Sequence, residues 1–244
     1  MPSLPSFDCD TGPAASDIRS ALVKSGVAEL HHLLPASKVD AWRAEAATRY
    51  DDICSLLRAK GIDPEKDKVR QREVMRRSPG RLDVRFEPDT DPGWWLELKR
   101  DPLIAEVLAS LLGADYRYLF SGVVVAQPGA RVQHTHRDGG SGLFPEQPLP
   151  MPAYAISLFV PLDGFGPEYG PTEFFPGKWL VDPAEDDQSI CANLKVGSAL
   201  LFDYRIPHRG GENRSSQNRT YMYSVLARPW FGDHLNYNEP SLFE

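Results

Sequence analysis

The residues best suited to chemistry are three histidines and one aspartate. His134, His136 and Asp138 lie in one short run, and His208 follows much later. Alternate residues of a strand point to the same face, so the first three can share one face near a strand end. Two histidines and a carboxylate at strand ends are typical of the facial triad that holds non-haem Fe(II). A His-x-Asp triplet alone is weak support, because it arises often by chance.

An arginine placed after His208 adds a second function. Arg219 follows His208 by eleven residues, across a polar stretch rich in glycine, serine and asparagine. If His208 ends one strand and Arg219 begins the next, the turn brings the arginine back to the same site. A guanidinium there can grip a carboxylate through two parallel hydrogen bonds, as the far carboxylate of 2-oxoglutarate requires. Without the histidine, Arg219 would be interpreted as a surface residue.

Taken together, these motifs resemble a known family. The order His-x-Asp, distal histidine and arginine eleven residues later is similar to the phytanoyl-CoA dioxygenase family of Fe(II)/2-oxoglutarate enzymes. The segment Gly170–Gly177, which reads Gly-Pro-Thr-Glu-Phe-Phe-Pro-Gly, and the segment Arg228–Phe231 also resemble that family. The resemblance covers residues 116–231, about half of the chain.

The resemblance implies roles for individual positions. Arg219 matches the residue that binds the distal carboxylate of 2-oxoglutarate, and Gln133 and Thr172 match positions that can face the other end of this cosubstrate. The implied iron ligands, which are also the catalytic residues, are His136, Asp138 and His208.

Two departures from the family pattern affect these assignments. Lys178 and Trp179 replace a Ser-His pair, which alters the expected substrate contacts of that loop. Gly210 stands where some members carry a serine that helps to bind 2-oxoglutarate. His134 is not expected to be a fourth ligand, because a closed site would block the cosubstrate. Asp138 is present, whereas related halogenases lose this carboxylate, and its presence favours hydroxylation, desaturation or another oxygenase outcome.

The implied activity is oxidation of a C–H bond in a small organic metabolite. The partners would be this substrate, O2 and 2-oxoglutarate, with release of succinate and CO2. One alternative is a cupin-like jelly roll that binds a metal or ligand without catalysis, although a pure metal binder needs no carboxylate clamp such as Arg219. A zinc hydrolase is the remaining alternative, but no general base stands out at motif spacing. The sequence identifies neither the substrate nor the exact oxidation.

Apolar spacing predicts helices first and strands afterwards. Steps of three and four residues predict helices at Ser16–Ser25, with Ser16 as N-cap, at Ser37–Lys60, and from Asp101 to Leu112. Short apolar runs separated by glycine and proline turns predict strands, and the fold is expected to be mainly β with helical additions (α+β), in a sandwich or barrel. The predicted strands are 27–30, 116–126, 131–136, 154–161, 172–175, 189–194, 198–204 and 219–228.

The resemblance refines this expectation to a double-stranded β-helix, the jelly roll of cupins, with N-terminal helices packed against it. We found no internal repeat and no linker. The chain is therefore expected to form a single domain over residues 1–244. Residues 1–115 would be its mainly helical part, 116–231 its jelly-roll core and 232–244 its tail.

Composition limits the partners. The chain has 244 residues and a formal charge of −7, so neither general nucleic-acid binding nor binding to anionic membranes is expected. No run approaches the roughly 18 apolar residues of a membrane span. Three scattered cysteines and an N-terminus without signal-peptide character predict a reducing, cytoplasmic location. The oligomeric state stays open.

Substrate contacts are the least constrained part of the prediction. Six arginines occur at residues 70–85, and a solvated basic helix is the simplest interpretation. Pro79-Gly80 would break that helix, and the alternation after it predicts a strand with Arg81 and Arg85 on one face. We hypothesise that one of them binds an anionic group of the substrate. The further candidates at the mouth of the site are Trp94, Trp95, Phe144, Arg205 and Trp230.

Overall fold

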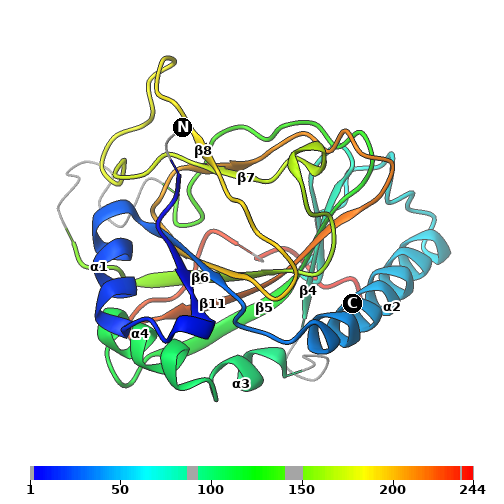
Figure 1. Cartoon of the computed structure of the whole chain (residues 1–244). Coiled ribbons are helices and arrows are strands. Elements are labelled where there is room, and N and C mark those ends of the chain that lie inside the picture. Colours follow the sequence, from blue (N-terminus) through cyan, green and yellow to red (C-terminus); the bar gives the residue numbers. More distant parts are fainter. Residues whose placement is uncertain (1–2, 87–92, 141–150, 237, 244) are drawn as a thin grey trace.

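A large mixed sheet forms the centre of the protein (Figure 1). The computed structural model describes residues 3–86, 93–140, 151–236 and 238–243. The strand order of this sheet is β1-β2-β9-β6-β11-β5-β4-β3, and all neighbours are antiparallel except β1 and β2. Its strands are β1 (Ser6–Asp8), β2 (Val27–His31), β3 (Val74–Ser78), β4 (Arg81–Phe86), β5 (Arg117–Ala126), β6 (Ala155–Pro161), β9 (Ala199–Asp203) and β11 (Arg219–Ala227).

Helices cover one face of this sheet. They are α1 (Ala15–Ser25), α2 (Ala36–Ala59), α3 (Trp94–Leu98) and α4 (Pro102–Leu112), with short 3-10 turns at Cys9–Thr11 and Pro167–Tyr169. Their apolar stripes share one buried cluster with alternate strand residues such as Leu82, Val123 and Met222. The helical spacing in the sequence is therefore explained by burial against the sheet.

A smaller sheet lies across the other face. It contains β10 (His208–Gly210), β7 (Thr172–Phe174) and β8 (Ile190–Cys191) in the order β10-β7-β8. Figure 1 shows β7 and β8 on one side of the large sheet and α3 and α4 on the other. Two facing sheets, with helices outside the larger one, form a jelly roll that is mainly β with helical additions. This confirms the predicted fold class.

Most predicted elements agree with the structure within two residues, but the N-terminal half differs. β1 pairs with β2 and β3 pairs with β4, so residues 1–115 contribute four strands as well as helices. The predicted basic helix is therefore wrong: β3 and β4 form a hairpin in which Gly80 has a φ of +72°. Helix α1 is preceded by Ala14 without a side-chain cap, so Ser16 is not its N-cap.

The predicted strand at 131–136 is also absent. Within the described residues it is an extended segment with only an isolated bridge, between His136 and His208. Arg131, Val132, His134 and Thr135 are all exposed, so no face of this segment is buried and a regular ladder has little to stabilise it.

Candidate metal centre

Backbone pairing sets His136 and His208 side by side. Each donates its amide hydrogen to the carbonyl of the other, at 3.0 Å and 2.9 Å. Residues that exchange both bonds stand directly opposite, and their side chains project from the same face. The two ring centroids are 4.5 Å apart. The extended segment before Asp138 and the short strand β10 thus bring together residues that are 72 positions apart in the chain.

Both imidazoles are oriented by their own chain. The Nδ1 of His136 lies 2.9 Å from the carbonyl oxygen of His134, and that of His208 lies 3.0 Å from the carbonyl oxygen of Ile206. A carbonyl only accepts, so Nδ1 carries the hydrogen and Nε2 keeps its lone pair for a metal. Burial lowers the pKa of His208 to about 4, against the opposing effect of Asp138, and so favours the neutral ring that a metal requires.

Asp138 completes the group. One of its carboxylate oxygens lies 3.6 Å from Nε2 of His208, and the other accepts a hydrogen bond of 3.1 Å from Ser157. One potential ligand atom from each of His136, Asp138 and His208 lies within 4.8 Å of the others. His134 is exposed and is not part of this group.

The group forms part of the wall of a cavity of about 620 Å³ between the two sheets. Large-sheet residues that line it include Phe159, Tyr221 and Tyr223, and Thr172 and Gly210 line it from the small sheet. The volume lies within the usual range of small-molecule sites, about 300–1,000 Å³. The cavity can therefore hold a cosubstrate and part of a substrate next to the histidines.

Arg219 lies in the same cavity and is only 3% exposed. The loop before it is held by Asn213, whose amide donates to the carbonyl oxygens of Ala126 and Gln217 at 2.8 Å. Arg219 makes one long hydrogen bond, 3.4 Å, to the carbonyl oxygen of Tyr169, and no carboxylate of the described residues forms an ion pair with it. Burial lowers its pKa, while the charges of Tyr221 and Asp163 act in the opposite direction.

Gln133 and Thr172 also line the cavity. The side-chain oxygen of Gln133 accepts a hydrogen bond of 2.9 Å from the amide of Gly210. Thr172 stands opposite Gly210 in the pairing of β7 with β10. The structure therefore brings both residues to the cavity wall around Gly210, two residues from His208.

Of the predicted substrate residues that the structure describes, only Arg81 reaches this cavity. Arg85, two positions later, lies over the ring of Phe120 at 5.2 Å. Arg205 pairs with Asp203 at 2.6 Å and faces a separate, smaller pocket.

The predicted tryptophans lie elsewhere. Trp94 and Trp95 are buried in the core between the helices and the sheet. The short helix α3 packs against α2, so the ring of Trp94 stacks on that of Trp42 with 5.4 Å between the ring centroids. Trp230 is 58% exposed. Phe144 lies outside the described residues.

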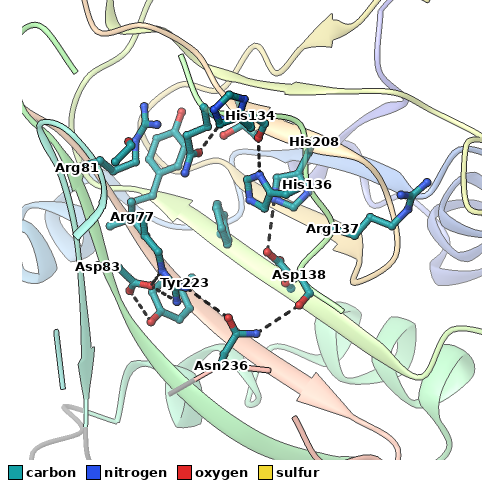
Figure 2. A pocket seen from close by; sticks show the side chains of 18 of the residues that line it. Arg77, Arg81, Asp83, His134, His136, Arg137, Asp138, His208, Tyr223 and Asn236 are labelled. Carbon is teal, nitrogen blue, oxygen red and sulfur yellow. Dashed lines mark hydrogen bonds and ion pairs between the residues drawn. The ribbon is translucent and has the colours of Figure 1, made fainter. Parts of the chain in front are cut away.

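Two further residues contact the candidate ligand Asp138. Ser157 is the only polar residue in the apolar run of β6, and its alternation with Phe159 could have placed it on the cavity face. Asn236 donates to the main-chain oxygen of Asp138 at 3.3 Å and accepts from Arg77 at 3.4 Å, as Figure 2 shows. No sequence signal identified Asn236, which belongs to the tail.

A jelly roll with two histidines, a carboxylate and a buried arginine around one cavity defines the class of metal-dependent double-stranded β-helix proteins. The sequence model of the family described as phytanoyl-CoA dioxygenase (PhyH) matches residues 22–221. The chain therefore belongs to the phytanoyl-CoA dioxygenase family, as the sequence motifs predicted.

Similar proteins agree with this assignment. The chain is 32% identical over 143 residues to dioxygenase aneA of Aspergillus aculeatus, covering 54% of this chain and 47% of the relative. It is 34% identical over 126 residues to dioxygenase trt7 of Aspergillus terreus, covering 48% and 44%. The chain thus matches about half the length of these curated relatives.

Solved structures share the fold. The non-haem alpha-ketoglutarate-dependent epimerase SnoN from nogalamycin biosynthesis has a TM-score of 0.63 and 18% identity, covering 93% of this chain and 94% of that one. SnoN is also known in complex with Fe3+, alpha-ketoglutarate and nogalamycin RO.

Proposed function

We propose that this protein is an Fe(II)- and 2-oxoglutarate-dependent dioxygenase that hydroxylates a C–H bond of a small organic metabolite. The observation that carries the proposal is the joint placement of the His136–Asp138–His208 group and the buried Arg219, which forms no ion pair within the described part of the chain, on one cavity. The first group suits a metal and the second suits a dicarboxylate. Family membership and the related dioxygenases support the same activity.

The residues of the metal centre fit Fe(II). Two neutral imidazole nitrogens and one carboxylate oxygen form the donor set of non-haem iron oxygenases. In this proposal His136, Asp138 and His208 hold the metal through Nε2, a carboxylate oxygen and Nε2. The carbonyls of His134 and Ile206 fix the ring orientations, and Ser157 orients Asp138. Such supporting hydrogen bonds tune both affinity and geometry.

The far end of the cavity fits a carboxylate. Arg219 is buried and forms no ion pair with a carboxylate of the described residues, and a bound 2-oxoglutarate would supply one. Gln133 and Thr172 would contact the rest of the cosubstrate, close to the metal. When bound, iron and 2-oxoglutarate activate O2, release succinate and CO2, and deliver one oxygen atom to the substrate. The protein binds and orients the reactants and shields them with the aromatic wall formed by Phe159, Tyr221 and Tyr223.

We also propose that residues 1–244 act as one domain. β4 from the N-terminal half pairs with β5 of the core, and it carries Arg81 into the cavity. On this view the N-terminal half contributes to the site through β4.

Succinate release tests the activity. The purified protein would be incubated with Fe(II), ascorbate, O2, 2-oxoglutarate and a metabolite library, and both succinate and oxidised products would be followed by mass spectrometry. Succinate that depends on both iron and 2-oxoglutarate, together with a product heavier by one oxygen, supports the proposal. Metal binding without any succinate across the library would instead favour the cupin-like, non-catalytic alternative.

A further inference from the structure

One residue of the tail, Asn236, lines the cavity beside the candidate metal centre. Its side-chain amide donates to the main-chain oxygen of Asp138 at 3.3 Å and to a carboxylate oxygen of Asp233 at 2.8 Å. The hydroxyl of Tyr204 donates to the same oxygen of Asp233. The tail therefore reaches the candidate ligand through a side chain that neighbouring hydrogen bonds hold in place.

Asp138 depends on such contacts because it lies in a turn and not in a strand. The residue after it, Gly139, donates its amide hydrogen to the carbonyl oxygen of Tyr204 at 3.0 Å. Among the described residues, Asn236 is the one that donates to the main-chain oxygen of Asp138. The two candidate histidine ligands, in contrast, are held opposite each other by paired backbone bonds.

Asn236 also joins Asp138 to the opposite wall of the cavity. Arg77 donates to the side-chain oxygen of Asn236 at 3.4 Å and to the carboxylate of Asp83 at 2.8 Å. Asp83 is buried and accepts a hydrogen bond of 2.8 Å from the hydroxyl of Tyr223. Figure 2 shows these contacts in series between the two walls. Because a guanidinium only donates, the amide oxygen of Asn236 faces Arg77 and its NH2 group faces Asp138.

The later part of the tail is held separately, at the start of β3. The hydroxyl of Ser241 and the amide of Leu242 donate to the buried carboxylate of Glu73 at 2.5 Å and 2.7 Å. The amide of Arg72 donates to the carbonyl oxygen of Pro240 at 3.0 Å. The tail is therefore anchored on both sides of Asn236, so the position of this side chain is well defined.

We propose that Asn236 is a positioning residue of the metal centre, which holds the main chain of Asp138 so that its carboxylate points toward the metal. This inference rests on the proposed function, because it takes Asp138 to be an iron ligand. Ser157 restrains the carboxylate, and Asn236 restrains the backbone that carries it. The tail would then belong to the metal centre, although it lies outside the residues 22–221 that the family model matches.

The test measures the Kd for Fe(II) by anaerobic calorimetry in the wild type, Asn236→Ala and Asn236→Asp. The aspartate variant keeps the shape of the side chain and an acceptor for Arg77, but it has no NH2 group to donate to Asp138. Asn238→Ala is the matched control, because Asn238 lies in the same tail, is exposed and donates to the carbonyl oxygen of His234.

We expect both Asn236 variants to raise the Kd for Fe(II) about ten- to a hundredfold, as loss of a hydrogen bond that supports a metal ligand does, and the control to stay within about twofold. The visible absorption maximum of the complex of Fe(II) and 2-oxoglutarate should also shift in both variants, because the orientation of Asp138 changes. Hydrogen exchange at the amides of 239–243 should keep its wild-type rate, because Glu73 holds that part of the tail.

Two results would overturn the inference. A wild-type Kd for Fe(II) in both Asn236 variants would show that the tail does not position Asp138. A raised Kd accompanied by fast exchange at 239–243 would indicate release of the whole tail and not a role of the Asn236 amide. Failure of the wild-type protein to bind Fe(II) at all would instead refute the proposed function.

Discussion

Replacement of Arg219 by alanine should weaken 2-oxoglutarate binding and leave iron binding intact. Arg219 is buried and has no ion-pair partner among the described residues, so the cosubstrate carboxylate would be its main acceptor. The candidate ligands belong to other segments, and Arg219 donates no hydrogen bond to them. The two functions can therefore be separated in one variant.

The expected loss of 2-oxoglutarate affinity follows from the burial of the charge pair between Arg219 and the cosubstrate carboxylate. Loss of one partner from a buried, hydrogen-bonded charge pair costs about 2–5 kcal/mol. Arg81 lines the same cavity and retains part of the attraction, so we expect the lower part of this range, about 2–3 kcal/mol, or a rise of roughly thirty- to a hundred-and-fiftyfold in Kd. Arg219→Lys keeps the charge but loses the planar fork, and should show a smaller rise.

The assay is anaerobic calorimetry with 2-oxoglutarate on the Fe(II)-loaded protein, combined with metal analysis of the same samples. Arg214→Ala is the matched control, because Arg214 lies in the same loop but is exposed. We expect full iron content in all three variants and wild-type affinity in the control. Unchanged 2-oxoglutarate affinity in Arg219→Ala would refute the assignment of Arg219 and favour a metal-binding jelly roll without a cosubstrate.

The remaining predictions concern the metal and the tail. We expect loss of iron and of turnover, with a folded circular-dichroism spectrum, in each of the variants His136→Ala, Asp138→Ala and His208→Ala. The control His134→Ala should retain iron by elemental analysis. Retention of metal in any of the first three variants would remove that residue from the ligand set. Glu73 is 3% exposed and accepts a 2.7 Å hydrogen bond from the amide of Leu242. Glu73→Ala should therefore reduce the free energy that holds the tail on the protein by about 1.5–3 kcal/mol. The measurement is hydrogen exchange, which should become faster at the amides of 238–243. Unchanged exchange at these amides would contradict the prediction.

Elements whose apolar residues recur at regular spacing were predicted most reliably. The alternation at Arg81–Phe86 predicted both the strand and its faces, because Leu82 and Val84 pack in the core and Arg81 lines the cavity. The step from His208 to Arg219 was expected to join the end of one strand to the start of the next; Arg219 does begin β11, but His208 begins the short strand β10 and does not end a strand.

Long-range packing could not be predicted in the same way. β1 and β3 are short edge strands whose partners are set by the register of other strands, and their sequences carry no alternation. Trp94 was a candidate for the mouth of the site although such a residue is more often in the core, and its stacking on Trp42 of α2 places it in the core. Asn236 reaches Asp138 from a segment 98 residues away, which no local spacing encodes.

The most direct test of the central claim is the visible absorption spectrum of the anaerobic protein loaded with Fe(II) and titrated with 2-oxoglutarate. Chelation of Fe(II) by the 2-oxo acid produces a charge-transfer absorption band. Neither Fe(II) bound alone nor 2-oxoglutarate bound alone produces this band. We predict a saturable band at one equivalent in the wild-type protein and its loss in Asp138→Ala. An iron-loaded wild-type protein that develops no band, or a band of equal size in Asp138→Ala, would contradict the proposal that His136, Asp138 and His208 present iron to 2-oxoglutarate.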